Sequence, residues 1–238
     1  MNQPNTTFAG STAIVTGASR GFGRGIAAAL TAAGAHVVGV ARNGATVNAD
    51  ATDPATARRL IDEYQPRTVV LCAGAAPQMS PLQNQTWESF SRNWNVDVAQ
   101  AFHWIRETLS RPLPPGSSVI AISSGAALNG SPLSGGYAGA KATVRLITGY
   151  AAMESERAGL GIDYVSVLPS LTPVTELGAM AVAAYAERQG VDFDTFAQSL
   201  QPALTAEHVG KSVLEIATGG QRGHRAYTLS SAGLSPLG

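Results

Sequence analysis

Three side chains in this sequence have types and spacings that suit proton transfer at an oxygen atom. Tyr137 and Lys141 are the first and last residues of the segment YAGAK, which opens a predicted helix, so both face one side of it. Ser124 precedes Tyr137 by thirteen residues and follows a predicted buried strand. A free tyrosine loses its proton only near pH values of about 10, and a nearby ammonium favours the phenolate. With a serine hydroxyl to hold a substrate oxygen, the set could act as general acid and base.

A glycine-rich turn lies near the N-terminus, between a predicted strand at residues 12–15 and a predicted helix at 24–33. Its sequence, TGASRGFG at residues 16–23, has the spacing G-x-x-x-G-x-G. Glycines let the backbone turn sharply and approach a ligand, and a helix N-terminus offers unpaired N–H groups to an anion. A tight turn without a ligand is the alternative. We expect a dinucleotide here, with its pyrophosphate at the helix N-terminus and with these cofactor-binding residues: Gly17, Ser19, Arg20, Gly21, Phe22 and Gly23.

The end of the second predicted strand, residues 36–40, indicates which dinucleotide is bound. An acidic residue at this place binds the ribose 2′-hydroxyl of NAD, whereas an arginine suits the 2′-phosphate of NADP. The strand is followed by Ala41, Arg42 and Asn43, without an acid. Arg42 and Arg20 could clamp a phosphate by charge-assisted hydrogen bonds, which favours NADP(H) over NAD(H). Alternatively, Arg42 is a solvated residue that ends a strand.

Short apolar runs alternate with longer helical patterns along the whole chain. Predicted strands cover residues 12–15, 36–40, 68–71, 118–123, 164–168 and 226–229, and predicted helices cover 24–33, 54–64, 87–109, 137–157 and 206–218. This alternation predicts an α/β fold, a doubly wound parallel sheet with helices on both faces, in a single domain at 1–238. Residues 169–203 form a long connection with scattered apolar residues, which we expect to be a lid over a substrate. A peripheral pair of helices packed on the core is the alternative.

Composition excludes several classes of protein. Sixteen basic and sixteen acidic side chains give no net charge, and charged residues make up 13% of the chain, so we expect no nucleic acid and no membrane as partner. The single cysteine excludes an internal disulfide, and four scattered histidines predict no metal site. The first residues lack the features of a signal peptide, so a cytoplasmic protein is expected. Only two of the basic residues are lysines, Lys141 and Lys211.

Taken together, these motifs resemble those of the short-chain dehydrogenase/reductase family, which has a Rossmann-type fold. The resemblance covers nearly the whole chain: TGxxxGxG at residues 16–23, a variant of N-A-G at Cys72, Ala73 and Gly74, and Y-x-x-x-K at Tyr137 and Lys141. It implies a catalytic tetrad of Asn95, Ser124, Tyr137 and Lys141. It also implies a cofactor site that takes in Asp50, Ala51, Ala73, Gly74 and Pro169, with Tyr137 and Lys141 beside the nicotinamide.

The resemblance also implies a role for each member of the tetrad. Tyr137 is the expected general acid in reduction and general base in oxidation. Lys141 would support its phenolate and bind the nicotinamide ribose, and Ser124 would hold the substrate oxygen. Asn95 would kink its helix and hold a water that links Lys141 to solvent. A role in packing alone is the alternative for Asn95.

The sequence departs from the family's pattern at three places. Cys72 replaces the asparagine of N-A-G and is expected to be a small buried hydrophobe. Residues 43–48 are too few for the usual crossover helix before Asp50, so the sheet edge there should be short or irregular. Pro169 is followed by Ser170 instead of glycine, and neither Thr172 nor Thr175 has the spacing of the threonine that usually comes next.

The expected function is an NADP(H)-dependent oxidoreductase that interconverts an alcohol and a small to medium, largely apolar ketone or aldehyde. A regulator that binds NADP(H) and senses redox state without turnover is an alternative. An enoyl reductase fits less well, because that branch of the family spaces its tyrosine and lysine further apart. The resemblance further implies a homotetramer or homodimer.

Overall fold

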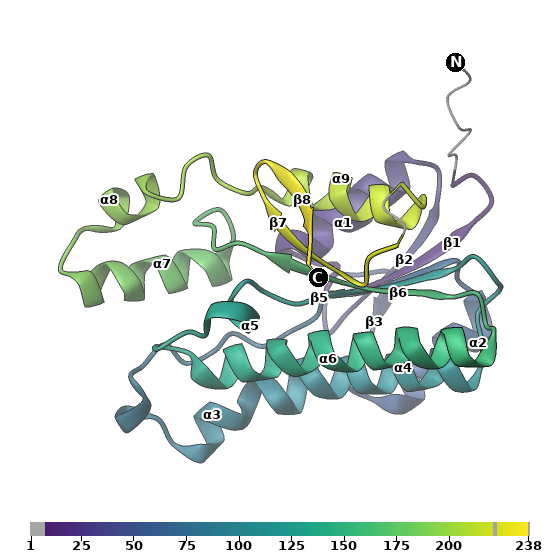
Figure 1. Ribbon diagram of the computed structural model, residues 1–238, viewed down its shortest axis with the longest axis horizontal. Helices are drawn as coiled ribbons and strands as arrows, with labels where there is room; N and C mark the ends of the chain where they lie inside the picture. Colours follow the sequence, from purple (N-terminus) through teal and green to yellow (C-terminus); the bar gives the residue numbers. More distant parts are fainter. Residues whose placement is uncertain (1–7, 221–222, 238) are drawn as a thin grey trace.

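The computed structural model describes residues 8–220 and 223–237, and these form one continuous sheet with helices on both faces (Figure 1). The strand order is β3-β2-β1-β4-β5-β6-β7-β8, parallel up to β7 and antiparallel between β7 and β8. The strands are β1 (Thr12–Thr16), β2 (His36–Ala41), β3 (Val47–Asn48), β4 (Thr68–Leu71), β5 (Ser118–Ile122), β6 (Asp163–Pro169), β7 (Ala226–Ser230) and β8 (Gly233–Pro236). The first seven residues, which the sequence predicts not to be a signal peptide, lie outside the described residues, as do 221–222 and 238.

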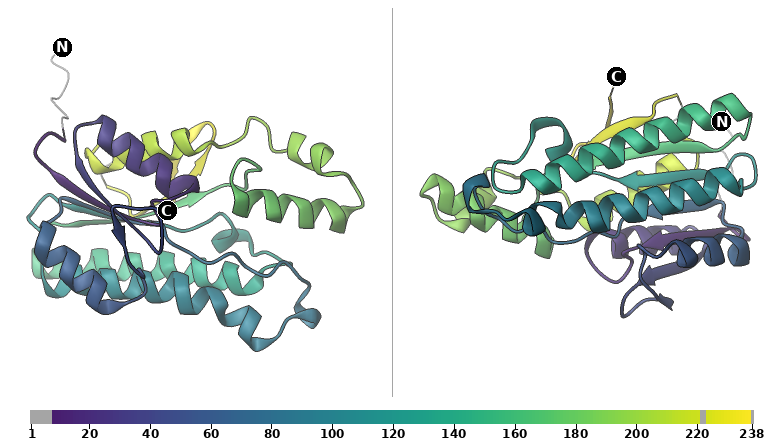
Figure 2. Two further views of the ribbon diagram at one scale, coloured as in Figure 1. Left: turned by 180° about the vertical axis from the view of Figure 1, so that it is seen from behind. Right: turned by 90° about the horizontal axis from the view of Figure 1, so that it is seen from below.

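The larger helices cover the sheet in two layers, one on each face. The helices are α1 (Gly21–Ala32), α2 (Pro54–Tyr64), α3 (Trp87–Asn93), α4 (Ala99–Ser110), α5 (Ala126–Asn129), α6 (Gly135–Ala158), α7 (Glu176–Gln189), α8 (Phe193–Gln198) and α9 (Ala206–Ala217), with a short 3₁₀ turn at Leu82–Asn84. Helices α1 and α9 lie together on one face, and α2, α4 and α6 cover the other; α7 and α8 extend beyond the sheet (Figures 1 and 2).

Both faces of the sheet are buried, because successive residues of a strand point to opposite sides. In β1, Ile14 packs into the core under α2, α4 and α6, whereas its neighbours Ala13 and Val15 pack into the core under α1 and α9. All four residues of β4 are buried. These strands therefore read as continuous apolar runs, as expected for a parallel sheet covered on both faces.

The predicted α/β class is confirmed, and the differences from prediction are local. The predicted helix at 87–109 consists of α3, a π-helical turn at Trp94–Val98 and α4 in succession. Residues 169–203 contain two helices, α7 and α8. The sequence reading missed β8, which adds to the sheet edge by hairpin pairing with β7. Its segment carries Gly, Ser and Pro, which obscure the strand pattern.

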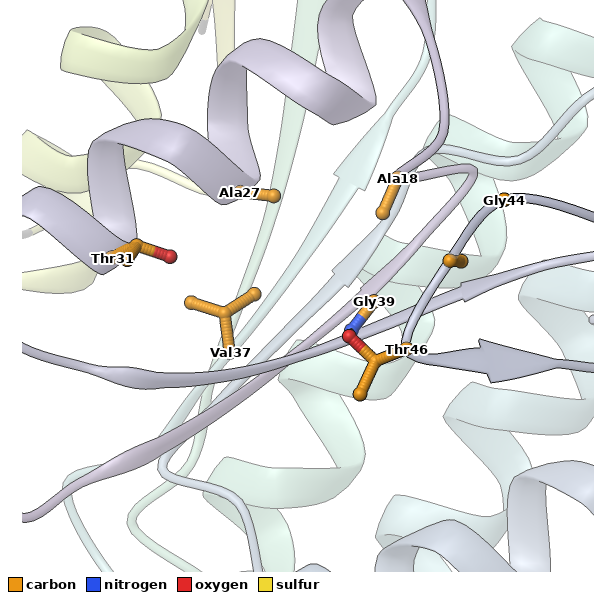
Figure 3. A pocket seen from close by; sticks show the side chains of 8 residues that line it. Ala18, Ala27, Thr31, Val37, Gly39, Gly44 and Thr46 are labelled. Carbon is orange, nitrogen blue, oxygen red and sulfur yellow. The ribbon is translucent and has the colours of Figure 1, made fainter.

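The connection between β2 and β3 has no helix, as the short spacing predicted, and a hollow of about 310 Å³ lies beside it (Figure 3). A right-handed crossover from β2 to β3 would place a helix on the face that holds α1. The hollow lies on that face and is lined by Ala18, Ala27, Thr31, Val37, Gly39, Gly44, Ala45 and Thr46. The missing helix thus leaves the edge of the sheet open beside the glycine turn.

Helices α1 and α9 pack with their backbones in close approach. A Cβ on Gly25 would lie 2.3 Å from the carbonyl oxygen of Ala206, and one on Gly210 would lie 2.5 Å from the carbonyl oxygen of Gly25. No side chain fits at either contact without a shift of the helices. The layer that covers one face of the sheet therefore depends on two glycines.

Gly25→Ala should force α1 and α9 apart and lower the free energy of unfolding by about 1–3 kcal/mol, the usual cost of overpacking. Gly149→Ala is the matched control, since Gly149 lies inside α6 with nothing within 4 Å of the added Cβ. That change should raise stability by about 0.5–1 kcal/mol, because alanine favours a helix over glycine. Urea denaturation measures both, and equal effects would contradict the packing argument.

Candidate active site

The strand ends bring the predicted catalytic residues to one edge of the sheet. Ser124 follows β5, and Tyr137 and Lys141 lie one turn apart in α6. The Oγ of Ser123 donates a hydrogen bond of 2.7 Å to the carbonyl oxygen of Lys141, which ties the end of β5 to α6. Ser124 and Tyr137 are half-buried, whereas Lys141 is buried. The predicted grouping of serine, tyrosine and lysine is thus possible in this fold.

The backbone of α6 lies unusually close to α3 at the residue before Tyr137. A Cβ on Gly136 would lie 1.9 Å from the carbonyl oxygen of Phe90. Only glycine allows this approach, so Gly136 fixes the first turn of α6 against α3.

The side chain of Lys141 lies between its own helix, β5 and the π-helical turn. Its Nζ donates to the carbonyl oxygen of Ile122 at 3.1 Å and lies 5.7 Å from the centre of the Tyr137 ring. It also forms an ion pair with Asp97, with 3.0 Å between Nζ and Oδ1. Burial alone would lower the pKa of Lys141, but the negative charge of Asp97, with a smaller contribution from Tyr137, outweighs this effect. The pKa is therefore raised above the ordinary value for lysine.

Asn95, the asparagine expected in the tetrad, is not the residue of its turn that contacts Lys141. Asn95 is exposed, whereas Asp97, two residues later, is buried and contacts Lys141. Residues two apart in a helix do not face the same side, so only one of them can point at α6. The helix irregularity expected at Asn95 is present as the π-helical turn, but Asp97 is the side chain that it directs to Lys141.

Sequence reasoning missed Asp97 because the resemblance drew attention to an asparagine. The signal that could have found it is the spacing within NWNVDV, where Asn93 and Asp97 stand four residues apart. Both are buried, and the Nδ2 of Asn93 donates to Oδ2 of Asp97 at 3.1 Å.

The glycine turn forms a narrow backbone cradle next to the end of β4. Gly17 has a φ of +69°, and a Cβ on it would lie 2.8 Å from the amide nitrogen of Ala73. A Cβ on Gly23 would lie 2.1 Å from the carbonyl oxygen of Gly17. The hydroxyl of Thr16 accepts hydrogen bonds from the amides of Cys72 and Ala73, at 2.9 and 3.1 Å, which joins the two strand ends.

The first turn of α1 faces this cradle and has no side-chain cap. Arg20 occupies the N-cap position without a capping hydrogen bond, so the N–H groups of the first turn are left for a ligand. Backbone donors and the positive end of a helix dipole are the chemistry that binds a phosphate. The cradle of Gly17, Gly21 and Gly23 therefore fits the pyrophosphate of a dinucleotide, and Ser19 and Phe22 lie half-buried within the same turn.

The two arginines predicted to bind a 2′-phosphate differ in their surroundings. Arg42 is exposed directly after β2, beside the open edge of the sheet. Arg20 is also exposed but forms an ion pair with Glu176 at the start of α7, with 2.6 Å between the nitrogen and oxygen atoms. A phosphate that recruits Arg20 must therefore compete with a carboxylate of the long connection.

The remaining predicted cofactor residues lie along the same edge. Asp50 is exposed, and its Oδ1 accepts hydrogen bonds from the amide and hydroxyl of Thr52. Ala51 is buried, and its carbonyl oxygen accepts a hydrogen bond from Trp104. Pro169 ends β6, and its carbonyl oxygen accepts a hydrogen bond of 2.9 Å from the amide of Gly125, the residue after Ser124.

The residues that depart from the family's pattern have structural roles. Cys72 is half-buried, and burial of its thiol raises the pKa to about 11, so the thiolate is disfavoured. Thr172 is buried and donates to the carbonyl oxygen of Leu204, whereas Thr175 caps the N-terminus of α7. Ser170 donates its amide to Leu229 of β7.

We searched residues 8–220 and 223–237 for a metal site and for a membrane-spanning helix and found neither. No three side chains from His, Cys, Asp and Glu gather there as a metal site would require. None of the helices in these residues is both long enough and apolar enough to cross a bilayer.

Comparison with known proteins places the chain in a family. A family profile described as enoyl-(acyl carrier protein) reductase matches residues 17–223. Carbonyl reductase [NADPH] 2 of Sus scrofa is 30% identical over 190 residues, which are 73% of this chain and 75% of that protein. Glycine betaine reductase of Emericella nidulans is 28% identical over 90% of this chain, but the match spans only 19% of that longer protein.

The fold has relatives among solved structures. The 3-ketoacyl-(acyl-carrier-protein) reductase of Brucella melitensis, solved with NADH, has a TM-score of 0.72 at 21% identity. The alignment covers 89% of this chain and 92% of that structure's chain. This likeness concerns the fold. Because the profile spans most of the chain and the porcine protein matches it over most of both lengths, the chain belongs to the short-chain dehydrogenase/reductase family of oxidoreductases.

Proposed function

We propose that the chain is an NADP(H)-dependent reductase that interconverts a carbonyl compound and an alcohol, with Tyr137 as general acid and base. The observation that carries the proposal is the position of Lys141, whose Nζ lies 5.7 Å from the Tyr137 ring centre at the strand edge that also holds the glycine cradle. In a doubly wound sheet, ligands bind outside the carboxyl ends of the strands, at the point where the strand order reverses. Here that point lies between β1 and β4.

The proposed mechanism assigns one task to each residue. A bound nicotinamide supplies or accepts a hydride at the substrate carbon. Tyr137 gives a proton to the substrate oxygen during reduction and takes it back during oxidation. Ser124 donates a hydrogen bond to the same oxygen and stabilises the charge that develops there. Lys141 places its ammonium beside Tyr137 and keeps the phenolate accessible.

The preference for NADP(H) rests on charge at the end of β2. Arg42 is exposed there, no acid follows the strand, and the missing crossover helix leaves room for a 2′-phosphate. Arg20 adds a second guanidinium to the same edge once it leaves Glu176. The name of the porcine relative, which includes NADPH, supports the same choice.

Residues 169–203 form the proposed lid over the substrate. Several of its apolar side chains are exposed, which suits a largely apolar substrate of small to medium size: Leu171, Val174, Val191 and Phe193. The hydroxyl of Tyr185 in α7 hydrogen-bonds Ser131 at 2.5 Å, and its ring stacks on Phe196 of α8. The lid is thus held to the segment that leads into α6 and Tyr137.

We also propose that the chain assembles as a homodimer or homotetramer through α4 and α6. These helices expose large apolar side chains on the side away from the sheet: Phe102 on α4, and Leu146, Tyr150 and Met153 on α6. Large apolar side chains exposed on neighbouring helices are typical of a protein interface.

Tyr137→Phe tests the proposed chemistry. Loss of the phenolic proton should lower kcat for reduction of a ketone panel by at least about a hundredfold, the usual contribution of a general acid. NADPH affinity, measured by fluorescence titration, should change little, because the ring is kept. Retained turnover would rule out Tyr137 as the acid. A wild-type chain that binds NADPH but reduces no ketone, aldehyde or enoyl substrate would support the regulator instead.

Arg42→Ala tests the proposed cofactor preference. Removal of a charged phosphate contact should raise KM for NADPH by about tenfold or more and leave KM for NADH nearly unchanged. Arg145→Ala on α6 is a control for loss of an arginine elsewhere, and it should leave the ratio of the two KM values unchanged. Equal effects of Arg42→Ala on both cofactors would contradict the phosphate clamp.

Glu176→Gln tests whether Arg20 is held back by the lid. An exposed ion pair contributes little, so release of Arg20 should lower KM for NADPH only modestly, by about two- to fivefold, without an effect on NADH. The gain should shrink at high salt, which already screens the ion pair. An unchanged or higher KM for NADPH would show that Arg20 does not contact the 2′-phosphate.

A further inference from the structure

Asp97 has no role in the proposed mechanism, but it lies beside Lys141, on which that mechanism depends. Its carboxylate is 1% exposed and the Lys141 side chain 8% exposed, with 3.0 Å between Oδ1 and Nζ. The cost of burying an isolated charge is several kcal/mol, so each of these groups requires the other. The ion pair joins the π-helical turn to α6 directly.

All the partners of Asp97 in the described part of the chain are donors. Besides Lys141, its Oδ2 accepts hydrogen bonds from the amide of Ala75 at 3.0 Å and from the Nδ2 of Asn93 at 3.1 Å. The surroundings of Asp97 thus place donors at both of its carboxyl oxygens.

The chain around Asp97 is shaped to admit it. A Cβ on Gly74 would lie 2.8 Å from Oδ1 of Asp97, so any side chain at position 74 would collide with the carboxylate. Asn93 donates to the carbonyl oxygen of Ala75 at 2.7 Å as well as to Asp97, which holds the segment after β4 beside the ion pair.

We propose that Asp97 is a positioning residue for Lys141: its carboxylate holds the ammonium in place and sets the pH range in which Tyr137 exchanges a proton. The inference rests on the proposed function for its second half. Three titratable side chains act on Lys141 from three elements: Asp97 from the π-helical turn, Tyr137 from α6, and Cys72 after β4. Of these, Asp97 carries the negative charge that partly cancels the electrostatic effect of the Lys141 ammonium on Tyr137.

The sign of the effect follows from this charge balance. With Asp97 present, the pair carries no net charge, and its support for a phenolate is weaker than that of an ammonium alone. Removal of the carboxylate would leave the ammonium uncompensated, and the phenolate would form at lower pH. In reduction, Tyr137 must carry its proton, so activity falls as pH rises through the ionisation of Tyr137.

Asp97→Asn is the direct test, with the pH profile of kcat/KM for NADPH-dependent ketone reduction as the readout. The falling limb should move to lower pH by about one unit, the order expected from one charge removed a few ångströms away. Asp163→Asn is the control, because Asp163 is exposed at the start of β6, at the opposite end of the strand from the site. An unmoved limb, or one moved to higher pH, would overturn the proposal, since a merely structural role would leave the profile in place.

A second measurement uses the unmodified protein and stands even where Asp97→Asn does not fold. The chain has only two lysines, so ¹³Cε-lysine labelling gives two NMR resonances, and Lys211→Arg assigns them. Lys141 should titrate above the ordinary lysine value of about 10.4. A midpoint at or below that value would show that Asp97 does not hold the ammonium. If the wild type reduces no carbonyl compound, the proposed function is wrong, and the NMR midpoint still decides whether the ion pair forms.

Discussion

The site depends on one close approach, between the backbone after β1 and the backbone after β4. A Cβ on Gly17 would lie 2.8 Å from the amide nitrogen of Ala73, and the Thr16 hydroxyl accepts hydrogen bonds from that amide and its neighbour. Strands β1 and β4 are adjacent, but the chain leaves them in opposite directions across the sheet. A crevice forms at such a point because no connection covers it. The first turn of α1 and the ends of β4 and β5 meet around it.

The charged centre of the site shows how a buried lysine is stabilised in this fold. Lys141 lies on α6, its carbonyl oxygen accepts a hydrogen bond from Ser123, and its ammonium reaches Asp97 and the carbonyl oxygen of Ile122. Burial would favour the neutral amine, yet the carboxylate reverses this preference. Gly74 contributes to this centre as well, because a side chain at position 74 would fill the space in which Asp97 meets Lys141.

The shortened connection between β2 and β3 shapes the opposite end of the candidate cofactor site. Without a crossover helix, Gly39 of β2 and residues 44–46 border an open hollow beside α1. The amide of Gly39 is instead paired with the Thr46 hydroxyl at 3.3 Å, so a side chain of the loop satisfies a backbone group of the strand. Arg42 consequently stands in an exposed setting, where a phosphate can approach it.

Much of this architecture follows from local sequence patterns. Apolar four- to six-residue runs such as 68–71 predict buried strands, and the glycines of residues 16–23 predict a phosphate cradle, because backbone geometry alone requires them. The four-residue spacing of Tyr137 and Lys141 places them on one helix face for the same reason. The absent crossover helix could also be read from six residues of spacing, since no helix of useful length fits there.

Other features depend on contacts between segments far apart in the chain. The family resemblance pointed to Asn95. Which residue of a helix faces α6 is set by the π-helical turn, however, and this turn brings Asp97 to a lysine 44 positions later. The ion pair between Arg20 and Glu176 and the pairing of β8 with β7 are further examples. In both cases the local sequence of one partner does not indicate the other. Most of the elements, the glycine cradle and the placement of Tyr137 and Lys141 on one helix face follow from the sequence, because these features need only short-range geometry. The charge that faces Lys141 follows from the packing of distant segments instead, because a buried charge is stabilised by whichever partner the packing brings to it.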